Sequence, residues 1–186
     1  MDFKVKAGDL LVAPPNMPDP RFNRSVLFLT HYNTRGAYAL CLNRPTEHTL
    51  NEIVKPLGLE FIDDQPLYWG GPVSLSTVWM LHDTGWSVSN TMRINDEWSI
   101  TSHEEMFHHL SKGIWPKRFR IMIGHATWDA GQLDAEIEGE EPWTHKDSWL
   151  SVRNPNPNWL VDLEAEQLWS SSCSICSQQT VDSWMV

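Results

Sequence analysis

The chain has 186 residues, of which 41% are hydrophobic and 11 are Trp, so its length and composition indicate one ordered domain with its own core. Its 24 acidic and 14 basic side chains give a net charge of -10, which disfavours nucleic acids and anionic membranes as partners. Three cysteines, and no apolar run long enough for a signal peptide or a membrane span, predict a cytoplasmic protein without a disulfide framework.

The first part of the chain predicts strands separated by turns. Apolar runs at residues 8–13, 25–31 and 37–43 are typical of strands, and a short turn at 33–36 joins the last two into a hairpin. Four prolines at residues 14–20 predict an irregular loop between the first two strands.

The middle of the chain predicts a short helix and two further strands. Thr49 and Glu52 have the spacing of a capping box, which indicates that a short helix begins there. Strands are expected at residues 66–69 and 77–82, with a Gly-Gly-Pro turn at 70–72 between them.

The second half predicts helices that alternate with strands. Ser102 and Glu105 repeat the capping pattern and open a helix that ends near Lys112. Asp129 is placed to cap another helix, with Gln132 at its third position. The remaining expected elements are a buried strand at 118–124, a helix at 131–138, a strand near 149–152 and a C-terminal helix near 164–178. Together these elements predict a single α+β domain over residues 1–186, with a mixed or antiparallel sheet and flanking helices.

Two clusters invite a metal or redox interpretation, and neither has the right geometry. Cys173 and Cys176 form a CxxC pair, but the pair lies deep within the predicted C-terminal helix, so we expect buried structural thiols. His103 and His108 are five residues apart, which is about 140° around a helix and not the spacing of a metalloprotease helix. We therefore expect neither a metal site nor a cofactor.

One pair of residues could support catalysis, and one cluster could bind an anion. His125 and Asp129 fall at the end of a predicted strand and the start of a predicted helix, where they form either an acid–base pair or an ordinary polar His beside a capping Asp. Lys117, Arg118 and Arg120 could meet a phosphate or an acidic partner, but a solvated, charge-protected strand edge fits them better.

A series of short motifs runs in order through residues 8–150. The motifs are Gly8-Asp-Leu-Leu-Val-Ala-Pro-Pro-Asn-Met17, Asp19-Pro-Arg-Phe22, Arg24-Ser-Val26, Gly36-Ala37, Leu42-Asn-Arg-Pro45, Tyr68-Trp-Gly-Gly-Pro-Val73, Leu81-His82, Trp128, Gly131-Gln-Leu133, Glu136-Ile137 and Trp149-Leu150. Each motif is weak alone, but the ordered set resembles the YqgE/AlgH family. The resemblance implies an AlgH-like α+β fold with a largely antiparallel, barrel-like mixed sheet and flanking helices.

The resemblance implies little about function. The family is usually described as having no known function, and some members carry the label of transcriptional regulator. The chain departs from the family pattern at Ala39, His125 and Thr127, and the likeness fades after Asn154. We therefore expect a divergent C-terminal helix after about residue 154.

Three turns could form one binding surface if the sheet brings them together. Loops held by a rigid sheet often carry binding sites, and an Arg side chain can bind a carboxylate or phosphate through two hydrogen bonds. The alternative is that the glycines only shape turns and that Arg44 makes an internal salt bridge. The residues of this candidate surface are Asn43, Arg44, Gly70, Gly71, Trp128 and Gln132.

Three functions remain as hypotheses. The first is a non-enzymatic binding or regulatory module for an unknown protein or small-molecule partner. The second is an enzyme of unknown reaction that uses a cleft near Arg44, His125 and Asp129. The third is a DNA-binding regulator, which the acidic charge disfavours.

Overall fold

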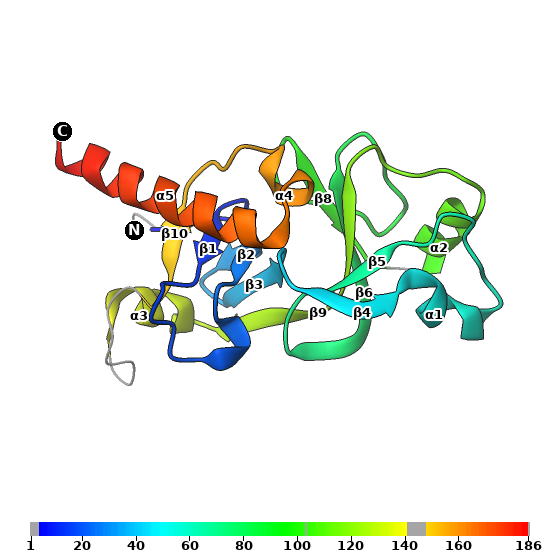
Figure 1. Cartoon of the computed structure of the whole chain (residues 1–186), viewed down its shortest axis with the longest axis horizontal. Helices are drawn as coiled ribbons and strands as arrows, with labels where there is room; N and C mark the ends of the chain where they lie inside the picture. The colour runs from blue at the N-terminus through cyan, green and yellow to red at the C-terminus, as the bar shows by residue number, and fades with distance from the viewer. Residues whose placement is uncertain (1–3, 103, 141–147, 186) are drawn as a thin grey trace.

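The structure is a computed structural model that describes residues 4–102, 104–140 and 148–185, without the side chains of residues 181–184 (Figure 1). Ten strands of this described part form one sheet. The strands are β1 (Leu10–Val12), β2 (Val26–Asn33), β3 (Gly36–Cys41), β4 (Pro45–Thr49), β5 (Pro66–Trp69), β6 (Val73–Asp83), β7 (Met92–Arg93), β8 (Trp98–Thr101), β9 (Phe119–Asp129) and β10 (Leu150–Val152).

The sheet is mixed and largely antiparallel. Its main path has the order β10-β1-β2-β3-β9-β6-β8-β7, while β4 pairs with β5 and β5 pairs with β9. The β5–β9 pair is parallel, and the other described pairs are antiparallel. The sheet curls into a half-barrel with β9 running through its centre (Figure 1). The predicted α+β class and mixed, barrel-like sheet are confirmed.

Helices cover both faces and one end of this sheet. They are η1 (Pro20–Phe22), α1 (Leu50–Val54), η2 (Lys55–Leu57), α2 (Glu104–Ser111), α3 (Gln132–Glu138), α4 (Trp159–Asp162) and α5 (Ala165–Trp184). Figure 1 shows α5 crossing β1, β2 and β10, with α3 at the opposite side of these strands and α1 and α2 at the far end. In the part of the chain that the structure describes, no helix is both long and apolar enough to cross a membrane.

Alternation along the strands divides the core into layers. On β3, Ala37 and Ala39 belong to a buried cluster that includes Leu133 of α3, whereas Leu40 belongs to a cluster that includes Leu168 of α5. Successive side chains of a strand point to opposite faces, so β3 supplies both layers. A third cluster packs beneath α1 and α2.

The central strand is longer than the sequence predicts. We expected it to end at Gly124, but β9 continues to Asp129 because Gly124 adopts φ 72° and the chain pairs with β3 beyond it. Ala126 and Trp128 are buried along this extension. The expectation that His125 ends a strand is therefore wrong, since it lies inside β9.

The start of α3 also differs from the prediction. The N-cap is Gly131, with φ 74° and no side-chain hydrogen bond, so Asp129 does not cap the helix. One of the two hydrogen bonds expected of a capping box is present, because the backbone N–H of Asp129 donates to the Oε1 atom of Gln132 at 3.0 Å. By contrast, the predicted capping box of Thr49 and Glu52 is present at α1.

Several strands were missed. The sequence did not indicate β4, β7 or β8, and it placed the start of β6 at residue 77 instead of Val73. A side-chain turn links β7 to β8: the Oδ1 atom of Asn95 accepts the N–H groups of Glu97 at 2.9 Å and Trp98 at 2.8 Å. Such Asx turns join strands without needing glycine.

The basic cluster is not a uniformly solvated edge. Arg120 is buried, donates to the carbonyls of Leu42 and Val161, and lies 4.2 Å above the ring of Tyr68. The expectation of a charged, solvent-facing edge is therefore wrong for Arg120, which ties β9 to the segment of α4.

The two C-terminal cysteines lie within α5, as expected from their position in the predicted helix. Cys176 is buried, Cys173 is half-buried, and both are free thiols that pack in the same apolar cluster. Burial raises the pKa of Cys176 to about 12, and a neutral thiol is a poor nucleophile. This arrangement fits structural thiols.

Candidate functional site

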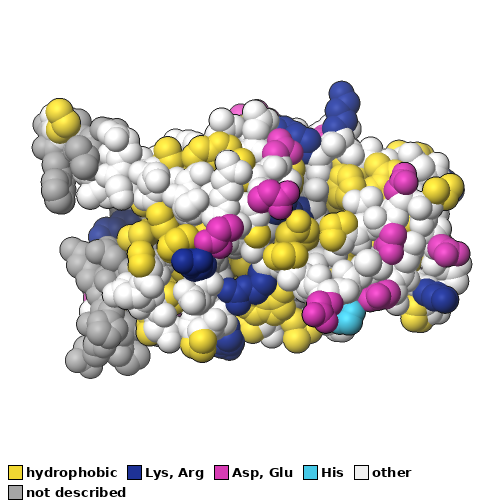
Figure 2. Space-filling view, viewed as in Figure 1, with side chains coloured by type: hydrophobic (Ala, Val, Ile, Leu, Met, Phe, Trp, Pro, Cys, Tyr) yellow, Lys and Arg dark blue, Asp and Glu magenta, His cyan; other side chains and the backbone are white. Residues whose placement is uncertain are grey.

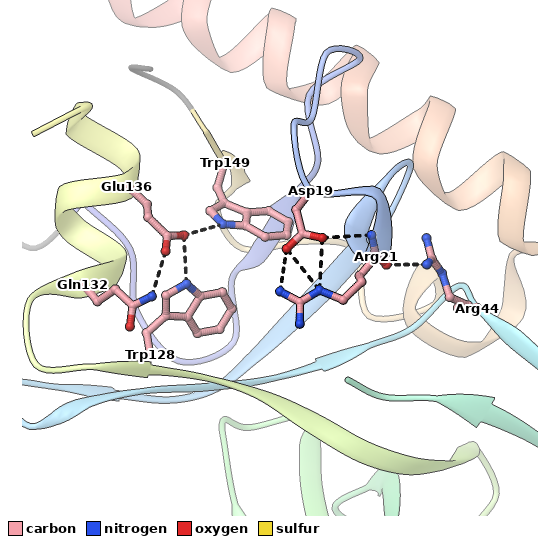
Figure 3. A network of polar contacts seen from close by, with 7 residues as sticks. All are labelled: Asp19, Arg21, Arg44, Trp128, Gln132, Glu136 and Trp149. Carbon is pink, nitrogen blue, oxygen red and sulfur yellow. Dashed lines mark hydrogen bonds and ion pairs between the residues drawn. The ribbon is translucent and has the colours of Figure 1, made fainter. Parts of the chain in front are cut away.

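A groove of about 380 Å³ lies between the proline-rich N-terminal loop and α3. We call it the tryptophan groove, and the residues that define it are Met17, Phe22, Pro72, Trp128, Gln132 and Trp149. The loop supplies one wall, α3 supplies the other, and the end of β9 forms the floor (Figure 3).

One carboxylate holds the floor of the groove. The Oε2 atom of Glu136 accepts the indole N–H groups of Trp128 and Trp149, each at 3.0 Å. Its Oε1 atom accepts the side-chain amide of Gln132 at 2.9 Å. The two indole rings meet edge to face, with centroids 6.1 Å apart and an interplanar angle of 82°. Figure 3 shows all three donors pointing at Glu136, so the two rings are fixed before any ligand arrives.

An ion pair closes the other end of the groove. Arg21 donates to Asp19 through its side chain at 2.7 Å and through its backbone N–H at 3.0 Å (Figure 3). The hydrogen bonds from the Arg21 side chain lower the pKa of Asp19 below its ordinary value. Phe22 follows in η1 and packs edge to face on Trp149 at 5.4 Å. The loop wall and the tryptophan floor are therefore one packed unit.

Arg44 supports this loop from behind. Its guanidinium donates to the carbonyl of Arg21 and, at 2.7 Å, to the carbonyl of Asn23, and it lies 5.4 Å from the centroid of Trp69. Asn43 acts similarly: its Oδ1 accepts the N–H of Val26 at 2.8 Å. The Arg44 guanidinium is thus bonded within the chain, as the alternative interpretation has it, but to main-chain carbonyls of the loop.

The Gly-Gly-Pro segment crosses the central strand. Because β5 and β6 pair with opposite edges of β9, the link between them must pass over its backbone. A Cβ atom on Gly71 would lie 2.1 Å from the carbonyl carbon of His125, and one on Gly70 would lie 2.4 Å from the oxygen of Gly124. The glycines therefore allow close packing of backbone on backbone, and Pro72 emerges into the groove.

The structure brings some of the predicted surface together. Trp128 and Gln132 line the tryptophan groove, next to Pro72. Arg44 and Asn43 lie behind its loop wall, and Gly70 and Gly71 lie in the segment that crosses β9. Figure 3 shows Arg44 in the same neighbourhood as Gln132, with Arg21 and Trp149 between them.

The residues named for catalysis do not share this site. His125 lines a second cavity, on the other face of β9, and neither Arg44 nor Asp129 lines either of the two cavities. Burial lowers the pKa of His125. The geometry thus gives no support to an acid–base pair of His125 and Asp129.

Two further observations concern metal ions and nucleic acids. Among the described residues, no group of three or more His, Cys, Asp or Glu side chains could hold a metal ion, and His103 lies outside those residues. The α-helices that the structure defines, α1 to α5, carry no Lys or Arg within their bounds. A basic recognition helix is the usual reader of a DNA groove.

The polar contacts of the site involve four residues that the sequence does not indicate as site residues: Asp19, Arg21, Glu136 and Trp149. A usable signal existed for Glu136, because it stands one helical turn after Gln132 and both lie near Trp128 along the chain. No comparable signal connects Trp149 to Glu136, because their contact depends on how β10 enters the sheet.

Comparison with known proteins places this geometry in context. The AlgH-like family matches residues 10–180. A UPF0301 protein of Marinomonas sp. (strain MWYL1) is 36% identical over 160 residues, which cover 84% of this chain and 85% of the relative. A UPF0301 protein of Burkholderia thailandensis is 34% identical over 174 residues, which cover 90% and 86%.

Two solved structures share the fold. The solution structure of AlgH from Pseudomonas aeruginosa superposes with a TM-score of 0.77 at 28% sequence identity, covering 94% of this chain and 91% of that one. The crystal structure of a Corynebacterium diphtheriae protein gives a TM-score of 0.67 at 22% identity, with coverage of 91% and 86%. The second likeness concerns the fold alone.

Proposed function

We propose that this chain, which belongs to the AlgH-like (UPF0301) family, is a non-enzymatic binding module whose recognition surface is the tryptophan groove. The observation that carries the proposal is the carboxylate of Glu136, which accepts three donors and fixes two indole rings at the floor of an open groove. Rings that are already ordered lose little entropy when a partner binds.

The chemistry of the lining supports binding over catalysis. No His, Cys or Lys lines the groove in the part of the chain that the structure describes. Asp19 is paired with Arg21, and Glu136 is occupied by its three donors. Both carboxylates therefore already have partners in the folded chain, which favours a structural role for them over a role as general base or nucleophile.

A protein segment is the partner that fits this groove best. Its apolar side chains can hold one or two side chains of a partner, and its aromatic and Arg residues are the types enriched where binding energy concentrates. Figure 2 shows hydrophobic side chains beside Lys and Arg side chains on the half of the molecule that carries the N-terminal loop. The partner therefore presents an apolar anchor flanked by acidic or polar groups.

The cytoplasm is the compartment we assign to this module. Its three cysteines are free thiols, as expected in a reducing environment. The partner is sought accordingly in cytoplasmic extract.

Affinity capture with matched charge variants tests the proposal. The immobilised protein is incubated with cytoplasmic extract of its source organism, next to the variants Arg21→Glu and Arg35→Glu. Both arginines are exposed, but only Arg21 lines the groove. Capture of a stoichiometric partner by the wild type and by Arg35→Glu, with a loss of about tenfold for Arg21→Glu, is the expected result. Equal capture by all three proteins would place recognition elsewhere, and no stoichiometric partner under varied conditions would count against a binding module.

A further inference from the structure

The second cavity lies in the mouth of the curled sheet, on the other face of β3 and β9. It has a volume of about 480 Å³ and receives side chains from β2, β3, β6, β7, β8 and β9. Along β3, Tyr38 and Leu40 line it, whereas Ala37 and Ala39 pack in the cluster that contains Trp128. Mouths of barrel-like sheets commonly hold small ligands, and this volume lies within the usual range for such sites.

Ring side chains form one wall of this cavity, which we call the aromatic cleft and define by Tyr38, Trp79, Met92, Arg93 and His125. The ring of Tyr38 lies 5.6 Å from that of His125, and His125 lies 5.8 Å from Trp79. At the rim, Tyr38 and Met92 are 46% and 52% exposed. Large apolar side chains gathered around one cavity favour a flat, apolar ligand surface.

The charge of the cleft is opposite to that of the whole protein. The chain carries ten more acidic than basic side chains, yet among the described residues the lining of the cleft includes the cation Arg93 and no Asp or Glu. Arg93 donates to Asp96 at 3.1 Å, but that carboxylate is 98% exposed. Such exposed ion pairs contribute little, so Arg93 can exchange Asp96 for an anion that enters the cleft.

His125 adds a hydrogen-bond donor to the wall. Its Nδ1 atom is buried and has no hydrogen-bond partner within the described chain. A buried N–H without a partner is costly, which favours the tautomer that carries the proton on Nε2. The ring then offers a neutral donor for an acceptor atom of a ligand.

We propose that the aromatic cleft binds a planar aromatic molecule that carries one anionic group. The ring packs against Tyr38 and the apolar floor, and the anionic group, a carboxylate or a phosphate, pairs with Arg93 at the rim. The proposal is independent of the tryptophan groove, since the two cavities lie on opposite faces of β3 and β9 and their linings share no residue.

Two fluorescent probes with the same ring skeleton test the proposal. 1-Anilinonaphthalene-8-sulfonate carries a negative charge, and N-phenyl-1-naphthylamine lacks it. The anionic probe is expected to bind the wild-type protein at one site per chain, and the neutral probe more weakly. Arg93→Gln is expected to weaken the anionic probe about five- to tenfold and to leave the neutral probe unchanged. Arg35→Gln is the matched control, because Arg35 is exposed and lines neither cavity.

A second pair of variants tests the wall of the cleft. Tyr38→Ala is expected to weaken both probes, while Tyr38→Phe retains them, and the partial exposure of Tyr38 makes either change tolerable to the fold. Circular dichroism verifies folding. Displacement of the anionic probe by 1-naphthoate or by 1-naphthyl phosphate then identifies the preferred anionic group. The proposal is overturned if Arg93→Gln and Arg35→Gln act alike, if Tyr38→Ala has no effect, or if neither naphthyl anion displaces the probe.

Discussion

Replacing Glu136 with Ala removes the acceptor that two buried indoles share. Trp128 and Trp149 are 6% and 4% exposed, and each N–H lies 3.0 Å from the same carboxylate oxygen. A buried donor without a partner costs about 1–3 kcal/mol. Because Glu136 itself is half-buried beside the groove, water can replace part of the lost bonding. We therefore expect Glu136→Ala to lower the free energy of unfolding by about 2–4 kcal/mol.

Urea unfolding followed by far-UV circular dichroism measures this loss. The control is Glu138→Ala, on the same helix, which removes an ion pair between Glu138 and Lys4. The side chain of Lys4 is 55% exposed and that of Glu138 is 33% exposed. A pair of that kind contributes at most about 1 kcal/mol. If the two variants lose the same free energy of unfolding, the Glu136 carboxylate does not fix the two indole rings. The proposal of a rigid tryptophan groove would then be contradicted.

Further predictions concern a buried imidazole, a glycine crossing and the free thiols. Burial lowers the pKa of His82, so the unfolded chain binds this proton more readily than the folded one. The free energy of unfolding should therefore fall as pH drops from about 7.5 to 5.5, and His82→Gln should reduce that slope. Gly71→Ala places a Cβ atom 2.1 Å from the backbone of β9, so it should lower the free energy of unfolding by more than about 3 kcal/mol or prevent folding. Gly113→Ala, whose Cβ atom has nothing within 4 Å, should lower it by only about 1 kcal/mol. Thermal melts compare the two variants. Half-buried Cys173 should react with Ellman's reagent before Cys41, which is fully buried and whose pKa burial also raises.

Each of these predictions has a clear contrary outcome. Equal pH slopes for the wild type and His82→Gln would mean that this imidazole is not linked to unfolding. A stable, folded Gly71→Ala protein would contradict the close crossing over β9. Reaction of Cys41 in the native protein, ahead of Cys173, would contradict the packing of the sheet.

The sequence predicted elements whose signals are local. The β2–β3 hairpin and the capped start of α1 follow from short stretches of apolar residues and turn residues. The sequence does not predict the extension of β9, because glycine at position 124 is typical of a strand end, although Ala126 and Trp128 continue an alternation of buried and exposed positions. Glycine inside a strand can mark a bulge as well as a strand end, so the alternation of buried and exposed positions predicts the end of β9 better than Gly124 does.

The candidate site was harder to predict because its contacts are long-range. The sequence indicates that the Arg44 guanidinium could bind an anionic ligand. In the folded chain this guanidinium donates instead to the carbonyls of Arg21 and Asn23. Trp149 reaches Glu136 only because β10 pairs with β1 at the edge of the sheet. No local sequence pattern encodes either contact. The sequence therefore indicates Arg44 as a site residue but does not predict the groups that it contacts, and it does not predict the contact of Trp149 with Glu136.

Site-specific photo-cross-linking tests the proposed binding role most directly. A benzoylphenylalanine residue replaces Pro18, which is exposed on the groove, or Arg35, which is exposed and lines neither cavity. Irradiation of living cells should give one discrete cross-linked partner from position 18 and none from position 35. The same products from both positions, or none from position 18 while the protein is folded and expressed, would contradict a recognition surface in the tryptophan groove.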